Sequence, residues 1–266
     1  MSIATNLPAR AKLLAYDLTM SIESEEDLAG MTRAGKVVAL TIAEMRAAIC
    51  AGMTTAELDD VALRCFARYG ARSAPRFTYG FPGQTCISVN EEIVHGVPGP
   101  RRLLGGDVVK IDVTAELNGY IADAATTVLL PPVAPAALRL KRSAERALAG
   151  ALDVARTGRR VSVIGRAVER QANRDGFAVV RELCGHGVGR RIHEDPQVPN
   201  YEDRFSRDRL TDGLVIAIEP MLTASSSRAV QMRDGWTIRT DTGDLAVHEE
   251  HTVVIRGGAP LVLTAA

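Results

Sequence analysis

The stretch 184–198 reads CGHGVGRRIHEDPQV and holds two of the five histidines of the chain. His186 stands between two glycines, which let other groups approach the backbone closely because they have no side chain. His193 is followed by an acidic pair and then by Pro196, and proline ends regular backbone pairing because it lacks an N–H. We therefore predict a shaped loop that carries two imidazoles. A glycine-rich turn with surface or core histidines would show the same letters, so the rest of the chain has to decide between these interpretations.

Two pairs of helices are predicted from start and stop signals. Ser24 can cap the first helix, and Thr54 with Glu57 forms a capping box for the second. The third helix begins at Pro135 and the fourth at Ser162, because proline suits the first turn of a helix and serine suits a helix start. The predicted helices are 24–49, 54–69, 135–152 and 162–173.

These helix pairs belong to an internal repeat. The segment GDVVKID at 106–112 matches GLVIAIE at 213–219, and both segments end on a carboxylate. The tripeptide His-Gly-Val occurs at 95–97 and again at 186–188. Helices, histidine loop, strand and acid thus recur in one order, which indicates duplication of a unit of roughly 100 residues. The duplication predicts an α+β fold with a site where its two halves meet.

Length and composition agree with one globular domain. The 266 residues include 32 basic and 32 acidic ones, and such a balance argues against a strongly basic nucleic-acid surface. The chain shows no secretory signal and no uninterrupted apolar run of about 18 residues, the length that a membrane span needs. The four cysteines include no CxxC pair, which favours a reduced, cytoplasmic setting. The expected segments are an N-terminal arm at 1–23 and a single domain at 24–266, with halves at about 24–130 and 135–256.

Asp112 and Asp123 are predicted to share one face of a hairpin. Asn118-Gly119 is a strong turn signal, and with these two residues at the turn Asp123 pairs with Thr114. Thr114 lies two positions after Asp112, so the two aspartates become diagonal neighbours. Like charges this close raise each other's pKa, and a bound polycation would remove the repulsion. The alternative is a slipped register with one acid exposed.

Two further acids, Glu219 and Glu250, extend this set. Glu219 ends the run VIAIE, and Glu250 lies in 245–255, which we expect to form a hairpin with 236–240. Together with His186, the four carboxylates offer about four negative charges, which two divalent cations would balance. An oxygen-rich set with one imidazole suits Mn, Fe or Co and tolerates Zn. Two such ions close together are a known device for activating a water molecule.

At this point the chain resembles a known family, the type I methionine aminopeptidases. Four motifs carry the resemblance, which runs from about residue 24 to 256: CISVNEEIVHGVPG at 86–99, IDV with an acid at 123, GHGVGRRIHEDPQV from 185, and IEPM with a later EEHT. The resemblance implies the pita-bread fold, in which two pseudo-symmetric α+β halves, their antiparallel sheet covered by helices, surround a dinuclear metal site.

The resemblance also implies roles for the acidic set. Asp112 is expected to bind one metal ion through both carboxylate oxygens, and Asp123 and Glu250 are expected to bridge the two ions. His186 and Glu219 are expected to bind the other ion. Glu219 is further expected to handle the proton of the attacking water. The two divalent ions are expected to be Co, Mn, Fe or Zn.

Substrate contacts follow from the same resemblance. His95 is expected near the scissile amide, where it assists proton transfer, and His193 is expected to donate a hydrogen bond to the carbonyl oxygen as that oxygen gains charge. The residues expected by matching position to line a methionine pocket are Tyr79, Phe81, Cys86, Ile192 and Trp236.

The chain departs from the family at three places. Ala124 and Ala125 follow the bridging aspartate, where a small hydroxyl residue is usual. Ile192 and Thr78 stand where the family usually has aromatic residues. These changes leave the metal set intact and bear on rate and on side-chain selectivity.

The predicted function is removal of the initiator methionine from nascent proteins whose second residue is small. The resemblance implies a cytoplasmic monomer that binds the N-terminal peptide of its substrate and touches the ribosome transiently, without a membrane or a specific nucleic acid as partner. One rival is an Xaa-Pro peptidase, whose relatives usually carry a large N-terminal domain ahead of the first helix predicted here. The other rival is a non-catalytic binding protein on the same fold, which should have lost metal ligands.

Overall fold

The computed structural model of the chain describes residues 21–225 and 228–265. Most of the predicted arm, residues 1–20, therefore lies outside the described residues. The helices are α1 (Glu25–Ala48), α2 (Thr55–Tyr69), α3 (Ala74–Tyr79), α4 (Pro135–Val154) and α5 (Ser162–Asp175). The strands are β1 (Arg72–Ser73), β2 (Cys86–Val89), β3 (Glu92–Val94), β4 (Val108–Leu117), β5 (Tyr120–Leu129), β6 (Ala178–Val179), β7 (Cys184–Gly187), β8 (Glu194–Pro199), β9 (Val215–Ile218), β10 (Met221–Thr223), β11 (Ala229–Gln231), β12 (Ile238–Thr240), β13 (Ala246–His248), β14 (His251–Val254) and β15 (Leu261–Val262).

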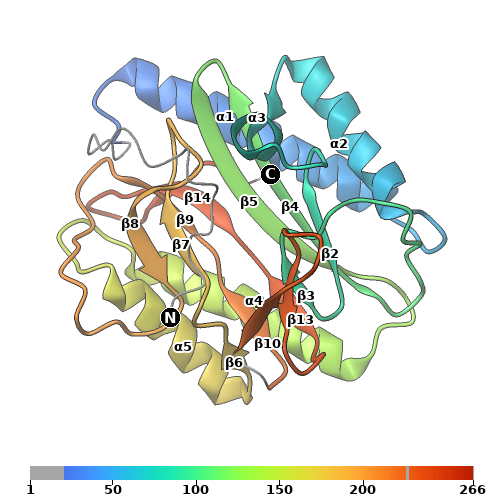
Figure 1. Cartoon of the computed structure of the whole chain (residues 1–266). Coiled ribbons are helices and arrows are strands. Elements are labelled where there is room, and N and C mark those ends of the chain that lie inside the picture. Colours follow the sequence, from blue (N-terminus) through green and yellow to red (C-terminus); the bar gives the residue numbers. More distant parts are fainter. Residues whose placement is uncertain (1–20, 226–227, 266) are drawn as a thin grey trace.

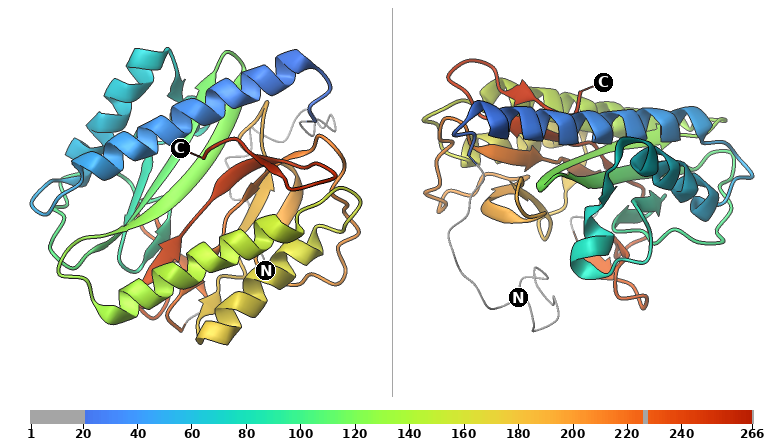
Figure 2. Two further views of the ribbon diagram at one scale, coloured as in Figure 1. Left: turned by 180° about the vertical axis from the view of Figure 1, so that it is seen from behind. Right: turned by 90° about the horizontal axis from the view of Figure 1, so that it is seen from above.

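Two larger antiparallel sheets form the centre of the fold, and α1 and α4 lie behind them in the view of Figure 1. One has the order β1-β4-β2 with β5 joined to β4, and the other has the order β15-β14-β9-β7-β8. Two smaller sheets, β13-β10-β6 and β11-β12-β3, complete the strands of the described part. The view from above in Figure 2 shows α1 and α4 in one layer with the strands beneath them. Over the described residues, none of the helices combines the length and the apolar character that crossing a membrane requires.

The helix ends follow the predicted signals. The Ser24 side chain accepts a hydrogen bond from the Asp27 N–H at the start of α1. Thr54 and Glu57 form both bonds of the capping box at the start of α2, and Gly70 ends that helix in the left-handed conformation. These side chains satisfy N–H groups that the first turn of a helix leaves without partners.

Each helix pair packs into its own hydrophobic core. In the first core, Met31 of α1 and Phe66 of α2 are buried against strand residues that include Ile111 of β4. In the second core, Leu140 of α4 and Ile164 of α5 are buried together with residues of β9 and β14. Burying one such side chain contributes roughly 1.5–3 kcal/mol, so each helix pair holds its own sheet in place.

The β4–β5 hairpin has the predicted register. Asp123 lies directly opposite Thr114 in the ladder, and Leu117 pairs with Tyr120 around the Asn118-Gly119 turn. Both turn residues have a positive φ, 53° at Asn118 and 83° at Gly119, as a type I′ turn requires. The prediction that Asp112 and Asp123 are diagonal neighbours on one face is therefore confirmed.

The two larger sheets meet along β5 and β14. The Glu250 N–H donates to the Ala125 carbonyl at 2.9 Å. The Asp123 N–H donates to Thr252 Oγ1 at 2.9 Å, and the same hydroxyl donates to the Asp123 carbonyl at 2.7 Å. These bonds place an acidic residue of one sheet beside an acidic residue of the other.

Two local predictions are wrong. The stretch 184–198 is mostly a strand pair, β7 and β8, rather than a loop, and its register shifts between His186 and Gly187. The shift leaves Asp195 and Pro196 as extra residues in β8, an edge strand. A bulge on an edge strand tolerates proline because no ladder bond is lost there.

The second wrong prediction is the hairpin between 236–240 and 245–255. β12 pairs instead with β11 and β3, and β13 pairs with β10. The chain also leaves regular pairing at Glu249 and Glu250, between β13 and β14. Alternating burial shows which residues of a strand face the core, but it does not name the partner strand.

Candidate metal centre

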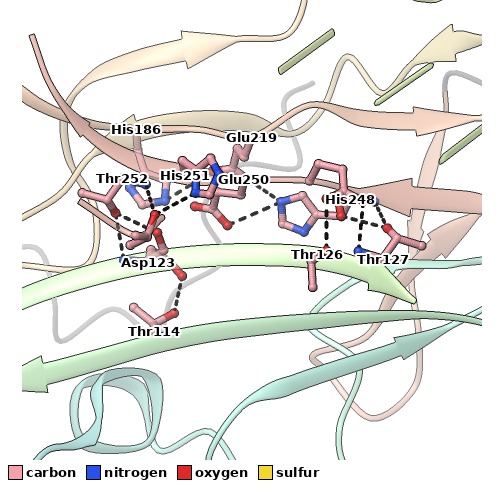
Figure 3. Close-up of polar contacts among 12 residues, drawn as sticks. Thr114, Asp123, Thr126, Thr127, His186, Glu219, His248, Glu250, His251 and Thr252 are labelled. Atoms are coloured by element: carbon pink, nitrogen blue, oxygen red, sulfur yellow. Dashed lines mark hydrogen bonds and ion pairs between the residues drawn. The ribbon is translucent and has the colours of Figure 1, made fainter. Parts of the chain in front are cut away.

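The five predicted metal ligands converge from both halves of the chain. Asp112 lies on β4 and Asp123 on β5, while His186 lies on β7; Glu219 follows β9 and Glu250 precedes β14. Donor atoms of Asp123, His186 and Glu250 all lie within 4.8 Å of one another. His186 Nε2 is 3.4 Å from Glu219 Oε1. Figure 3 shows the side chains of Asp123, His186, Glu219 and Glu250 gathered above β5.

The glycines around His186 serve close packing of strands. A Cβ on Gly185 would lie 2.4 Å from the Ala217 carbonyl oxygen, and one on Gly187 would lie 2.2 Å from the Asp195 carbonyl oxygen. The glycines thus admit the neighbouring backbones rather than a ligand. His186 Nδ1 lies 2.9 Å from the Gly187 carbonyl oxygen, so Nδ1 carries the proton and donates it. Nε2 then keeps a free lone pair on the side of the carboxylates, as a metal ligand requires.

Hydrogen bonds also orient Asp123. Its side chain is buried, and Thr114 Oγ1 donates to Asp123 Oδ1 at 2.9 Å. The backbone of Asp123 is fixed on the other side by Thr252. A carboxylate held on both sides keeps its remaining lone pairs in one direction, which suits a bridging ligand.

Asp112, Glu219 and Glu250 are hard to ionise without a cation. Burial raises the pKa of Asp112 well above its ordinary value, and the nearby Asp123 and Glu219 raise it further. Burial raises the pKa of Glu219 to about 8; His186 opposes this increase and Asp123 adds to it. Burial, followed by the charges of Asp123, Glu219 and Asp112, raises the pKa of Glu250 well above its ordinary value. Divalent cations would reverse these shifts.

The donor set therefore fits divalent metal ions. Asp112 Oδ1 and Glu250 Oε1 are buried oxygen atoms without a hydrogen-bond partner among the described residues. Buried polar atoms in folded proteins nearly always have a partner, and a coordinated cation would supply one. Oxygen donors with one imidazole are the ligands that Mn, Fe, Co and Zn accept.

His95 and His193 lie beside this set. The rings of His186 and His193 are 4.4 Å apart, and Tyr79 Oη lies 2.8 Å from His193 Nδ1. His193 is accessible to solvent, yet desolvation lowers its pKa well below the ordinary value, and the neighbouring His186 and His95 lower it further. Burial, together with His248 and His186, lowers the pKa of His95 to about 4. Both imidazoles are therefore neutral at pH 7.

The predicted pocket residues fall into two groups. Phe81 and Trp236 form an edge-to-face pair with ring centroids 5.2 Å apart. Cys86 lies opposite Asp112 in the β2–β4 ladder, and burial raises the pKa of its thiol, with Asp112 adding to the increase. Ile192 is buried like Phe81 and Cys86, but it belongs to the first hydrophobic core, which does not include those two residues.

Sequence reasoning missed one residue of the site. His248, at the end of β13, is 1% exposed and lies beside Glu219 and Glu250. A signal for it was present, because residues two apart on a strand share a face and His248 stands two positions before Glu250.

Comparisons with known proteins agree with this geometry. A model of metallopeptidase family M24 matches residues 29–257. Methionine aminopeptidase 2 of Bacillus subtilis (strain 168) is 38% identical over 92% of this chain and 99% of its own length. The crystal structure of methionine aminopeptidase from Thermotoga maritima aligns with a TM-score of 0.90 at 34% identity, over 93% of this chain and all of that one.

The prolidase from Pyrococcus furiosus shares the fold, with a TM-score of 0.73 over 93% of this chain and 66% of that chain, at only 20% identity. The predicted pita-bread fold is thus confirmed by both kinds of structure. The greater identity and the nearly complete coverage lie with the aminopeptidases. The chain therefore belongs to the methionine aminopeptidases of metallopeptidase family M24.

Proposed function

We propose that the chain removes the initiator methionine from nascent proteins whose second residue is small. The observation that carries the proposal is the convergence of four carboxylates and one imidazole from both halves of a methionine aminopeptidase chain. A non-catalytic relative would have no reason to keep this costly cluster of buried acids. Membership of the family establishes the fold and the metallopeptidase class. The substrate and the roles of the individual residues are what we propose.

Two divalent metal ions would be held by this set. Asp112 would bind one ion, His186 and Glu219 would bind the other, and Asp123 and Glu250 would bridge them. Bound divalent ions lower the pKa of a water molecule and polarise a carbonyl group. Mn, Fe, Co and Zn all suit these donors.

The protein groups would then move protons and stabilise charge. Glu219 would accept the proton of the attacking water, because bound cations would keep its carboxylate ionised and a positioned carboxylate can take up a proton. His193 would donate from Nε2 to the carbonyl oxygen as that oxygen gains charge. His95 would assist proton transfer at the scissile amide.

A methionine side chain would lie in the pocket that Phe81, Trp236, Cys86 and Tyr79 help to form. The paired rings of Phe81 and Trp236 offer an apolar surface, and methionine sulfur packs favourably on aromatic rings. Ile192 would support this wall from the core side, in line with its burial. Ile192 and Thr78 are both smaller than the aromatic residues usual at these positions, and the room they leave would decide selectivity.

The wider setting also belongs to the proposal. The chain would act in the cytoplasm as a monomer on the N-terminal peptide of nascent proteins, with transient contact to the ribosome. Residues 24–130 and 135–256 would be the duplicated halves of one catalytic domain.

The first experiment compares two peptides, Met-Ala-Ser and Ala-Pro-Ala, with metal-stripped protein to which Mn or Co is added back. Release of methionine from Met-Ala-Ser alone, and only with metal, is the expected result. Cleavage of Ala-Pro-Ala alone would make the chain an Xaa-Pro peptidase.

Variants separate the residue roles in the same assay. Glu219→Ala should abolish turnover and weaken metal binding, whereas His193→Ala should lower the rate with metal content unchanged. Near-normal activity of Glu219→Ala would remove that residue from the mechanism, and metal loss in His193→Ala would make His193 structural.

A further inference from the structure

His248 is a buried histidine whose ring makes no hydrogen bond to the described residues. Its side chain is 1% exposed, and neither ring nitrogen has a hydrogen-bond partner among the described residues. Nε2 lies 3.5 Å from Glu219 Oε2 and 3.6 Å from Glu250 Oε2. Figure 3 shows the ring aimed at these two carboxylates from the side opposite His186.

The backbone of His248 is held firmly. Its N–H donates to Thr127 Oγ1 at 3.0 Å, and the same hydroxyl donates to the His248 carbonyl at 2.8 Å. His248 also pairs with Met221 in the β10–β13 ladder, which places it beside the chain that leaves Glu219. Because its backbone is fixed in this way, the His248 ring is held in a position from which it points at the two carboxylates.

The geometry distinguishes His248 from the metal ligands. His186 Nε2 faces Oε1 of Glu219, whereas His248 Nε2 faces Oε2 of the same group. The ring of His248 thus approaches Glu219 at the oxygen that His186 does not face.

Separations of 3.5 and 3.6 Å are slightly longer than a hydrogen bond, for which donor and acceptor lie about 2.7–3.2 Å apart. A small rotation of either carboxylate would bring its oxygen within hydrogen-bond distance of His248 Nε2. An ionised carboxylate accepts strongly from an N–H, so the contact tightens once the centre carries its charges.

We propose that His248 is a positioning residue whose Nε2–H donates hydrogen bonds to Oε2 of Glu219 and to Oε2 of Glu250. It thereby directs the remaining lone pairs of both carboxylates toward the metal ions. The proposal rests on the proposed function only in taking Glu219 and Glu250 as metal ligands. Groups that hold metal ligands in this way typically change metal affinity by about 10- to 100-fold.

The test uses two variants of the full chain. His248→Phe keeps a flat ring and removes both nitrogens, whereas His248→Gln keeps an N–H donor at a similar reach. Titration calorimetry with Mn²⁺ gives the affinity and the number of ions, and the visible spectrum with Co²⁺ reports ligand geometry. We expect His248→Phe to bind Mn²⁺ about 10- to 100-fold more weakly with the same number of ions, and His248→Gln to recover most of the affinity.

His251→Gln is the matched control. His251 lies three positions further along, and its Nδ1 pairs with Thr264 Oγ1 at 2.9 Å rather than with a carboxylate. This variant should keep the wild-type affinity for Mn²⁺ and the wild-type Co²⁺ spectrum. Circular dichroism without metal shows whether each variant is folded, and His248→Leu replaces the phenylalanine variant if the larger ring prevents folding.

Two outcomes would overturn the inference. Wild-type Mn²⁺ affinity in His248→Phe would mean that the imidazole has no influence on the carboxylates. Loss of one whole ion in both His248→Phe and His248→Gln would make His248 a ligand instead. A wild-type chain that binds no divalent metal would contradict the proposed function itself, so the two failures are distinguishable.

Discussion

The Tyr79 hydroxyl lies 2.8 Å from Nδ1 of His193, and the two rings stack with their centroids 5.8 Å apart. Burial raises the pKa of Tyr79 to about 12, and the charge of Asp123 adds to the increase. The hydroxyl therefore keeps its proton at neutral pH and is able to donate a hydrogen bond to Nδ1, which we take as the arrangement in the active protein. His193 then carries its own proton on Nε2, the nitrogen with which it can donate to a substrate carbonyl.

Tyr79→Phe should lower kcat about 3- to 10-fold, the equivalent of one neutral hydrogen bond, with metal content unchanged. The ring and its stacking remain, so only control of the imidazole tautomer is lost. Steady-state kinetics with Met-Ala-Ser measure the effect. Tyr69→Phe, at the exposed end of α2, is the control; a wild-type kcat in Tyr79→Phe would show that His193 needs no such partner.

Divalent metal should stabilise the fold as well as the reaction. The clustered acids repel one another in the metal-free chain, and a ligand that binds only the folded state at 100 times its Kd adds about 2.7 kcal/mol. We expect the melting temperature to rise with Mn²⁺ and to fall again with a chelator. Asp112→Asn should show a smaller rise; an equal rise in both proteins would place the bound metal elsewhere.

Thr54→Ala should destabilise the chain by about 1 kcal/mol without changing kcat. The substitution removes the hydroxyl that accepts from the Glu57 N–H, and loss of such a cap typically has this magnitude. Urea unfolding measures it. Thr54→Ser keeps the hydroxyl and should restore most of the stability, whereas equal losses in both variants would point to the methyl group.

The α4–α5 pair should contribute an acid-sensitive part of the stability. Burial alone would raise the pKa of Asp175, but hydrogen bonds from Arg146 and Gln171, with the nearby Ser143 hydroxyl, outweigh it and lower the pKa to about 2. A carboxyl group with a lowered pKa contributes stability above its unfolded value of 3.8 and loses it as the pH falls toward 2. Arg146 is half exposed, so solvent screening reduces the contribution to about 1 kcal/mol.

Asp175→Asn should therefore unfold at a lower urea concentration than wild type at pH 7. The difference between the two urea midpoints should become smaller between pH 4 and pH 2. Asp153→Asn, an exposed acid near the end of α4, serves as the control and should show no such difference. A difference for Asp175→Asn that stays constant over this range would assign the loss to packing instead of charge.

The local signals that predicted the fold correctly were those with short-range causes. Ser24, the Thr54–Glu57 box and the Asn118-Gly119 turn act on their own neighbours, so their effect can be deduced from a few letters. The turn then fixed the register of a whole hairpin and with it the relation of Asp112 to Asp123. The internal repeat predicted a site where the two halves meet, and the resemblance to a family assigned roles to its residues.

The features that the sequence did not predict depend on contacts between residues far apart in the chain. Pro196 suggested a loop, but the bulge in β8 admits it because that strand lies at the edge of its sheet. The partner of β12 is β3, more than a hundred residues earlier. His248 gained its importance only through Glu219 on another strand.

The meeting of β5 and β14 has a consequence for how the protein is made. Asp112 and Asp123 come from the earlier part of the chain, and Glu250 comes from a much later part. During synthesis the first helix pair and its hairpin emerge before Glu250, whose N–H bonds to the Ala125 carbonyl on β5. A growing chain that stops short of Glu250 lacks one of the proposed metal ligands, so we expect activity only after nearly all of residues 24–256 have emerged.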